Sequence, residues 1–163
     1  MAEYSANAVQ TVNPGETVIF TEAPVPCNRG LVRWRQGSGN FLLRGWLPNR
    51  FRWRRCRCCC RRNAQDQSAN YLVDFGANVA VHAGQAVEPI TLAITIDGAT
   101  IPASTMEVTP AAVEQFQNVS RAINAQIWKD CCETVSVRNT SDIPINVVNA
   151  NIIISRPDLA VTR

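Results

Sequence analysis

The clearest pattern in the chain is an alternation of apolar and polar residues between positions 71 and 101. A strand repeats every two residues, so this alternation gives each strand one apolar face and one mixed face. Asp97-Gly98 follows the second apolar run, and this pair accepts the positive φ angles of a tight hairpin turn. The pattern predicts an all-β protein organised around a core hairpin in this stretch. The residues expected on its apolar face are Tyr71, Val73, Phe75, Ala77, Val79, Val81, Ile90, Leu92, Ile94 and Ile96.

Shorter apolar runs recur about every ten residues on both sides of this stretch, and turn-forming residues separate them, as is typical of a two-sheet sandwich. Pro24 and Pro26 cannot donate to a strand ladder, so we expect their segment at an edge or in a connection. Thr109 followed by Pro110 favours one helical turn at 109–114. Further strands are expected at 3–12, 16–21, 31–35, 40–45, 119–127, 133–138 and 145–155.

The last predicted strand, 145–155, differs from the others because apolar residues occupy both of its faces. A strand that is apolar on both faces is buried inside a larger stack of sheets or against another subunit. In one small sandwich, the outer face of this strand would have to meet a partner. Its uninterrupted apolar runs are Val147-Val148 and Ile152-Ile153-Ile154.

The chain has 163 residues, which suits one domain, and its 46% apolar and 18% charged residues are those of a folded globular protein. No apolar run approaches the roughly 18–20 residues that span a bilayer. The first residues lack the basic and apolar parts of a secretory signal. We therefore expect a protein with no membrane span. It would be cytoplasmic, or would reach a virion, a spore surface or an extracellular assembly without a classical signal.

The formal net charge of +3 hides a strong asymmetry along the chain. Eight arginines and no acidic residue lie between Arg44 and Arg62, and removing these eight charges from +3 leaves −5 for the remainder. The segment 47–69 is too charged for a core strand and lacks helical apolar spacing, so it is predicted to be an Arg/Cys-rich insertion in a single domain, 1–163. Its candidate contact residues are Arg50, Arg52, Trp53, Arg54, Arg55, Arg57, Arg61 and Arg62, and its thiols are Cys56, Cys58, Cys59 and Cys60.

Three interpretations of the insertion remain open. Four thiolates suit a tetrahedral Zn²⁺ site with bonds of about 2.3 Å, but structural zinc sites use two separated pairs of ligands, and these cysteines are nearly contiguous. Thiols from several chains could instead share a metal or form covalent bridges. Arginine contacts phosphate through two hydrogen bonds, and the neighbouring aromatic residues could stack on bases, which suits nucleic acid or another polyanion. The third interpretation is a contact with the acidic surface of a neighbouring subunit.

Several short motifs, in order along nearly the whole chain, resemble the jelly-roll module of complement globular heads and the tumour-necrosis-factor superfamily. Tyr4-Ser5-Ala6 is similar to the aromatic-Ser-Ala start of that module. Residues 70–75 are similar to its Gly-x-Tyr-x-Phe strand, with Asn in place of the glycine. The segments 92–101, 127–135 and 148–154 correspond to its Leu-x-x-x-Asn-Gly, Leu-x-x-Gly-Asp-x-Val and closing-strand motifs.

The resemblance implies an antiparallel jelly-roll sandwich and a compact homotrimer, which is the usual assembly of that family. The Arg/Cys insertion is foreign to the animal members, which favours the bacterial and prophage relatives, often surface or spore proteins. The trimer would bury the outer apolar face of the last and first strands. Its candidate interface residues are Tyr4, Val148, Ile152, Ile153 and Ile154.

Sequence motifs for catalysis are missing: the chain has no nucleophile elbow, phosphate-cradling glycine loop or zinc-protease motif. We therefore expect a non-enzymatic protein with no cofactor apart from a possible metal at the cysteine cluster. The favoured interpretation is a trimeric structural subunit of a phage, spore-surface or extracellular filament assembly. The alternative is a soluble binding module that recognises a glycan, a receptor or nucleic acid through the Arg-rich loop.

Overall fold

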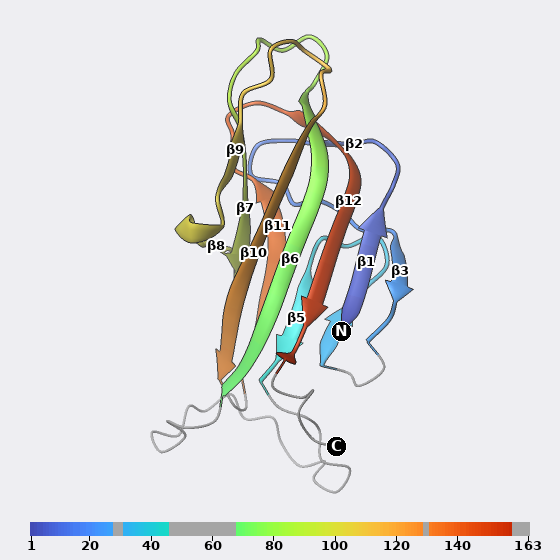
Figure 1. The fold of residues 1–163 in the computed structure, drawn as a ribbon, viewed down its shortest axis with the longest axis vertical. Coiled ribbons are helices and arrows are strands. Elements are labelled where there is room, and N and C mark those ends of the chain that lie inside the picture. The colour runs from blue at the N-terminus through green and yellow to red at the C-terminus, as the bar shows by residue number, and fades with distance from the viewer. Residues whose placement is uncertain (28–30, 46–67, 129–130, 158–163) are drawn as a thin grey trace, which may run out of the picture.

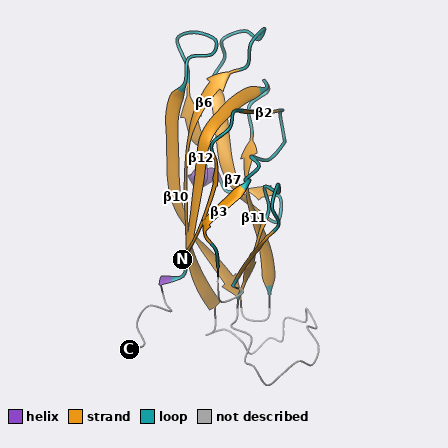
Figure 2. Ribbon diagram, turned by 90° about the vertical axis from the view of Figure 1, so that its right-hand side faces the viewer, coloured by secondary structure: helices purple, strands orange, loops and turns teal. Residues whose placement is uncertain are grey.

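The computed structural model describes residues 1–27, 31–45, 68–128 and 131–157. In this part of the chain, two antiparallel sheets pack face to face as a jelly-roll sandwich, and Figure 2 shows them as two layers. The first sheet contains, in spatial order, β10 (Gln117–Trp128), β6 (Ser68–Val81), β12 (Ile145–Ser155), β1 (Ala2–Ala6) and β3 (Glu22–Val25), with β2 (Gln10–Val12) also beside β12. The second contains β4 (Val32–Trp34), β5 (Phe41–Arg44), β11 (Cys132–Asn139), β7 (Ile90–Ile96) and β8 (Ala99–Thr100), with β9 (Met106–Val108) also beside β7.

The core lies between the two sheets and is filled by the inward-facing residues of both. Each odd-numbered residue of β6 from Ala69 to Val81 is buried, as the alternation predicts. An aromatic cluster fills one part of this core, where Tyr4 lies 4.8 Å from Phe41 and Phe41 lies 5.2 Å from Phe20, measured between ring centroids. Such aromatic contacts contribute packing energy beyond the area that they bury.

The predicted core hairpin is wrong in one respect. Its two apolar runs form β6 and β7, and these strands belong to opposite sheets: β6 pairs with β10 and β12, whereas β7 pairs with β11, β8 and β9. The Asp97-Gly98 turn does form, with φ of 47° and 82°, and it joins β7 to β8. Alternation identifies a strand and its buried face, but it does not identify the strand's partner.

Three smaller predictions also change. The first predicted strand, 3–12, divides into β1 and β2. The predicted strand 16–21 makes only isolated bridges, Thr17 to Arg138 and Phe20 to Ser38, although Val18 and Phe20 are fully buried. The helical turn expected at 109–114 is not formed. The described residues contain a 3-10 turn at Pro102–Ser104 and a further residue in 3-10 conformation, Pro157.

The other elements are confirmed within a residue or two. The short hairpin of β4 and β5 turns at Gly37, whose φ is 75°, and β3 is an edge strand, as Pro24 requires. The insertion predicted at 47–69 ends earlier, since Ser68 and the fully buried Ala69 belong to β6. Among the described residues, no helix is long and apolar enough to cross a membrane.

Candidate assembly surface

The outer face of the first sheet is the candidate site. In β6 the even-numbered residues from Asn70 to Asn78 are exposed or half-buried, and in β10 those from Asn118 to Trp128 are all exposed. The registers continue this surface from β10 across β6 to β12, which lie side by side in Figure 1. Its neighbouring residues form the rows Asn118–Asn78–Val148, Ala122–Asp74–Ile153 and Asn124–Leu72–Ser155.

The five predicted interface residues divide between the two faces of this sheet. Tyr4, Ile152 and Ile154 are at most 2% exposed and belong to the core, so they are not available to a partner. Val148 and Ile153 are half-buried on the outer face. The interface prediction therefore rests on these two residues alone.

A bulge explains why the last strand looked apolar on both faces. Asn149 has a φ of 52°, and the pairing of β12 with β6 shifts between Val148 and Asn151. A bulge adds one residue to a strand, so the inward positions change from odd to even numbers. Val147 before the bulge and Ile152 after it consequently point to the same side, into the core.

Two apolar residues on the outer face were not among the predicted interface residues. The side chain of Leu72 is 38% exposed and that of Trp128 is 46% exposed. Leu72 could have been found in the sequence, because it is apolar at an outward position of β6. Trp128 ends β10 opposite Ser68, the first residue of β6.

The polar side chains of this face are mostly uncharged and hydrogen-bond to one another across strands. The Asn118 Nδ2 donates to Asn78 Oδ1 at 3.2 Å, and the Gln126 Nε2 donates to Ser68 Oγ at 2.7 Å. Asp74 is the only charged residue at the outward positions of the described β10, β6 and β12, and none of these positions carries lysine or arginine. The next strand, β1, adds Glu3, which pairs with Ile153 and accepts a 2.8 Å hydrogen bond from Asn151 Nδ2. The described outward positions of these four strands therefore carry two acidic residues and no basic one, in a chain with sixteen basic residues.

The predicted contact arginines and the four clustered cysteines of the insertion lie outside the described residues. The two described residues that border it, Gly45 and Ser68, both lie near the end of β10. A Cβ on Gly45 would collide with the carbonyl oxygen of Trp128, and the Gly45 N–H donates to Cys131 O at 3.1 Å. The insertion therefore leaves and rejoins the sandwich at the end that carries Trp128.

The described residues contain no group of three or more His, Cys, Asp or Glu side chains that could hold a metal ion. Asp97 and Glu133 are close enough for their carboxylates to interact electrostatically. Burial and, secondly, the neighbouring Asp97 raise the pKa of Glu133. The Asp97 carboxylate is already used by the backbone, because its Oδ1 accepts a 2.6 Å hydrogen bond from the Thr134 N–H.

Comparison with known proteins identifies the fold. No protein-family model and no curated protein matches the sequence. The structure is similar to the globular domain of the zebrafish complement 1qA protein, with a TM-score of 0.61, 10% sequence identity and coverage of 99% of this chain and 97% of that one. It is also similar to the Eiger TNF of S. frugiperda, with a TM-score of 0.60, 10% identity and coverage of 95% and 90%. The chain therefore has the jelly-roll fold of complement globular heads and tumour-necrosis-factor domains.

Proposed function

We propose that this chain is a non-enzymatic structural protein, a homotrimeric jelly-roll subunit of a phage, spore-surface or extracellular filament assembly. The observation that carries the proposal is the outer face of the first sheet. Over β10, β6 and β12 it joins exposed or half-buried apolar side chains to uncharged amides and hydroxyls. Asp74 is the one charged residue at the described outward positions of these three strands, and Glu3 of β1 borders them beside Ile153. Depletion of charge at the centre of a surface distinguishes protein interfaces from the rest of the surface.

The apolar residues are placed where a partner would cover them together. Ile153 neighbours Asp74 of β6 and Glu3 of β1 and lies diagonally from Leu72. Val148 precedes Ile153 by five residues on β12. If a neighbouring copy covered these side chains, association would be stabilised by about 25 cal/mol for each Å² of apolar surface that is removed from water. The cross-strand amide pairs leave further donors and acceptors for contacts between subunits.

The oligomeric state tests this proposal. In reducing buffer at micromolar concentration, we expect a particle of three times the 18.0 kDa chain mass by sedimentation equilibrium. The variants Leu72→Arg and Ile153→Arg should sediment as folded monomers, because each places a cation in the centre of the buried surface.

Val87→Arg is the matched control, since Val87 is 43% exposed in the loop between β6 and β7, away from the outer face of the sheet. It should remain trimeric. A wild-type chain that stays monomeric, or arginine variants that stay trimeric, would exclude this surface as the trimer interface.

A second function, contact with nucleic acid or another polyanion through the insertion, is favoured by one observation. The exposed Trp128 pairs with Ser68, which follows the last arginine of the insertion, Arg62, by six residues in the sequence. An exposed aromatic ring beside a basic segment is the combination that binds single-stranded nucleic acid by stacking and charge. In the structural proposal, the same segment instead joins trimers to one another through acidic surfaces, or through a metal or disulfide shared by the clustered cysteines.

A further inference from the structure

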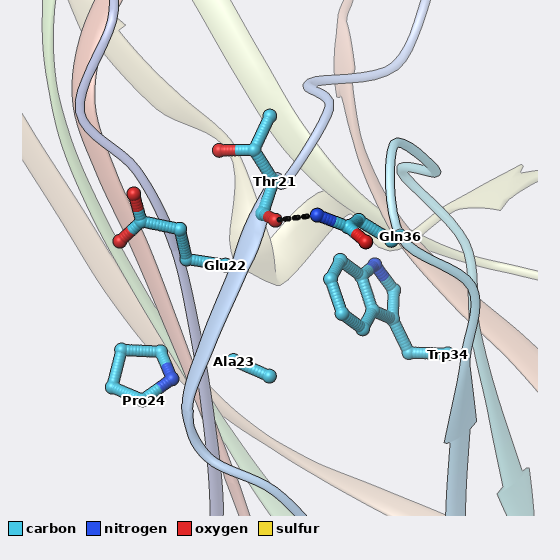
Figure 3. Close-up of a pocket in the computed structure, with 6 residues that line it drawn as sticks. All are labelled: Thr21, Glu22, Ala23, Pro24, Trp34 and Gln36. Carbon is cyan, nitrogen blue, oxygen red and sulfur yellow. Dashed lines mark hydrogen bonds between the residues drawn. The ribbon is translucent and has the colours of Figure 1, made fainter.

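We propose that a groove between the edge strands β3 and β4 is a saccharide-binding site, separate from the assembly surface. Figure 3 shows its six lining residues, with Trp34 on one side and Ala23 and Pro24 on the other. The groove has a volume of about 510 Å³ and is open to solvent. Its lining residues are Thr21, Glu22, Ala23, Pro24, Trp34 and Gln36.

The Trp34 ring is held in place before any ligand arrives. Its Nε1 donates a 2.9 Å hydrogen bond to the Ser38 carbonyl oxygen, and its ring centroid lies 5.0 Å from that of the buried Tyr4. Tyr4 in turn packs on Phe41 in the core. A half-buried indole that is backed by the core and tethered at its nitrogen forms a rigid platform, which lowers the entropic cost of binding.

The rim of the groove offers mainly hydrogen-bond acceptors. The Gln36 Nε2 is engaged with the Thr21 carbonyl oxygen at 3.1 Å, which leaves its Oε1 as the open group. Thr21 and Glu22 are exposed and also line the groove, and Figure 3 shows the Glu22 carboxylate on the side of β3 away from Trp34 and Gln36.

A saccharide has the matching chemistry. Its hydroxyl groups donate to the open oxygens, and its ring C–H bonds carry a partial positive charge that meets the negative face of the indole. Aromatic contact with a few convergent polar groups is the usual composition of a small-molecule site.

An extended peptide fits this edge less well. Addition of a strand requires regular N–H and C=O groups along β3, but Pro24 has no N–H, and the pairing of β1 with β3 shifts register between Glu3 and Ser5. The exposed carboxylate of Glu22 also opposes edge-to-edge pairing. The groove therefore favours a sugar over a β-strand.

Affinity electrophoresis tests this inference. We expect native gels that contain soluble xylan, galactomannan or hydroxyethylcellulose to retard the protein with at least one of these polymers. Trp34→Ala should weaken the retardation about tenfold or more, as loss of an aromatic anchor does. Glu22→Gln and Gln36→Ala change exposed residues outside the core, and each should weaken it by a smaller factor.

Trp128→Ala is the matched control, because it removes an exposed tryptophan outside the groove, and it should bind like the wild type. The melting temperature of each variant, measured by circular dichroism, separates loss of binding from loss of folding. The inference fails if no polymer retards the protein, if Trp128→Ala loses as much binding as Trp34→Ala, or if folded Glu22→Gln and Gln36→Ala both bind normally.

The groove does not depend on the proposed trimer, so the two can fail separately. The monomeric variant Ile153→Arg should bind the same polymer with an unchanged site affinity. If retardation is absent while sedimentation gives a trimer, only the saccharide site is excluded.

Discussion

At the scale of single residues, Tyr4 shows how the core fixes side-chain chemistry. Burial and, to a lesser extent, the charge that Cys27 acquires at high pH raise the pKa of Tyr4 to about 12. The ordinary value of about 10 applies to the unfolded chain. The folded state therefore holds the Tyr4 proton more tightly, and this contribution to stability is complete below pH 10 and is lost as the pH rises toward 12.

Tyr4→Phe should reduce the alkaline sensitivity of the fold. The free energy of unfolding in urea is expected to fall less between pH 9 and pH 11.5 in the variant than in the wild type, because phenylalanine has no proton to lose. Burial also raises the pKa of Tyr71, so the variant should keep part of the dependence. Identical slopes in the two proteins would contradict the assignment to Tyr4.

A second prediction for a single residue concerns the contribution of Gly45 to stability. Because a Cβ at this position would collide with the backbone of Trp128, Gly45→Ala should lower the free energy of unfolding by about 1–3 kcal/mol, the usual cost of overpacking. Gly76→Ala is the control, since its Cβ would meet nothing closer than 3.8 Å. Both changes are measured with Ile153→Arg present, so that assembly contributes to neither. Equal stability of the two would show that the Gly45 contact is dispensable.

At the scale of elements, the comparison between sequence and structure turns on β12. Alternation correctly predicts that 145–155 is a strand. The bulge at Asn149 could not be predicted, because it depends on how β12 pairs with β6 and with β1, and these are contacts between distant parts of the chain. Without the bulge, Ile152 and Ile154 appeared to need a partner subunit, although the core of the same chain buries them.

The same limit explains the other differences. The alternation of apolar and polar residues identified the strands β6 and β7. Their placement in opposite sheets, however, follows from the packing of the whole sandwich. Val18 and Phe20 of the predicted strand 16–21 are both fully buried, yet their segment has only isolated bridges in place of a strand. The Trp34 groove has no sequence signal, because Glu22 and Gln36 approach only when edge strands of two sheets come together.

Asn149 tests the role of the bulge. Its left-handed φ of 52° is unfavourable for most residues, so Asn149→Ala should lower the free energy of unfolding by about 1 kcal/mol, whereas Asn149→Gly should leave it nearly unchanged. Deleting Asn149 should be far more damaging, because all the core residues on one side of it would turn outward. Circular dichroism and urea unfolding measure all three. A deletion variant as stable as the wild type would exclude the bulge as the source of the register.

At the scale of the whole molecule, charge is distributed unevenly along the chain. The described outward positions of β10, β6 and β12 carry one charged residue, Asp74, whereas eight arginines fall between Arg44 and Arg62. The fold was predictable from alternation together with the order of motifs. The apolar residues of the outer face were only partly predictable, since Val148 and Ile153 were identified but Leu72 and Trp128 were not.

A prediction for the whole molecule concerns binding of polyanions by the Arg/Cys-rich insertion. If it contacts polyanions, retention of the protein on heparin should fall steeply as salt rises, because each neutralised charge releases a counterion. Replacing Arg52, Arg54, Arg55 and Arg57 by alanine should abolish this retention without changing the trimer mass. Arg33→Ala with Arg35→Ala removes exposed arginines of another segment and is the control. Retention that survives the first set and disappears with the second would place the basic contact elsewhere.

The junction at Gly45 and Ser68 has a consequence for the history of this protein. Because the Ser68–Trp128 pairing and the close contact at Gly45 fix both borders, the sandwich tolerates different lengths between them. Closing a flexible loop costs only about 0.6 kcal/mol more for each doubling of its length. The number of residues between these two borders can therefore change by insertion, deletion or recombination while the pairing of the two sheets is inherited unchanged.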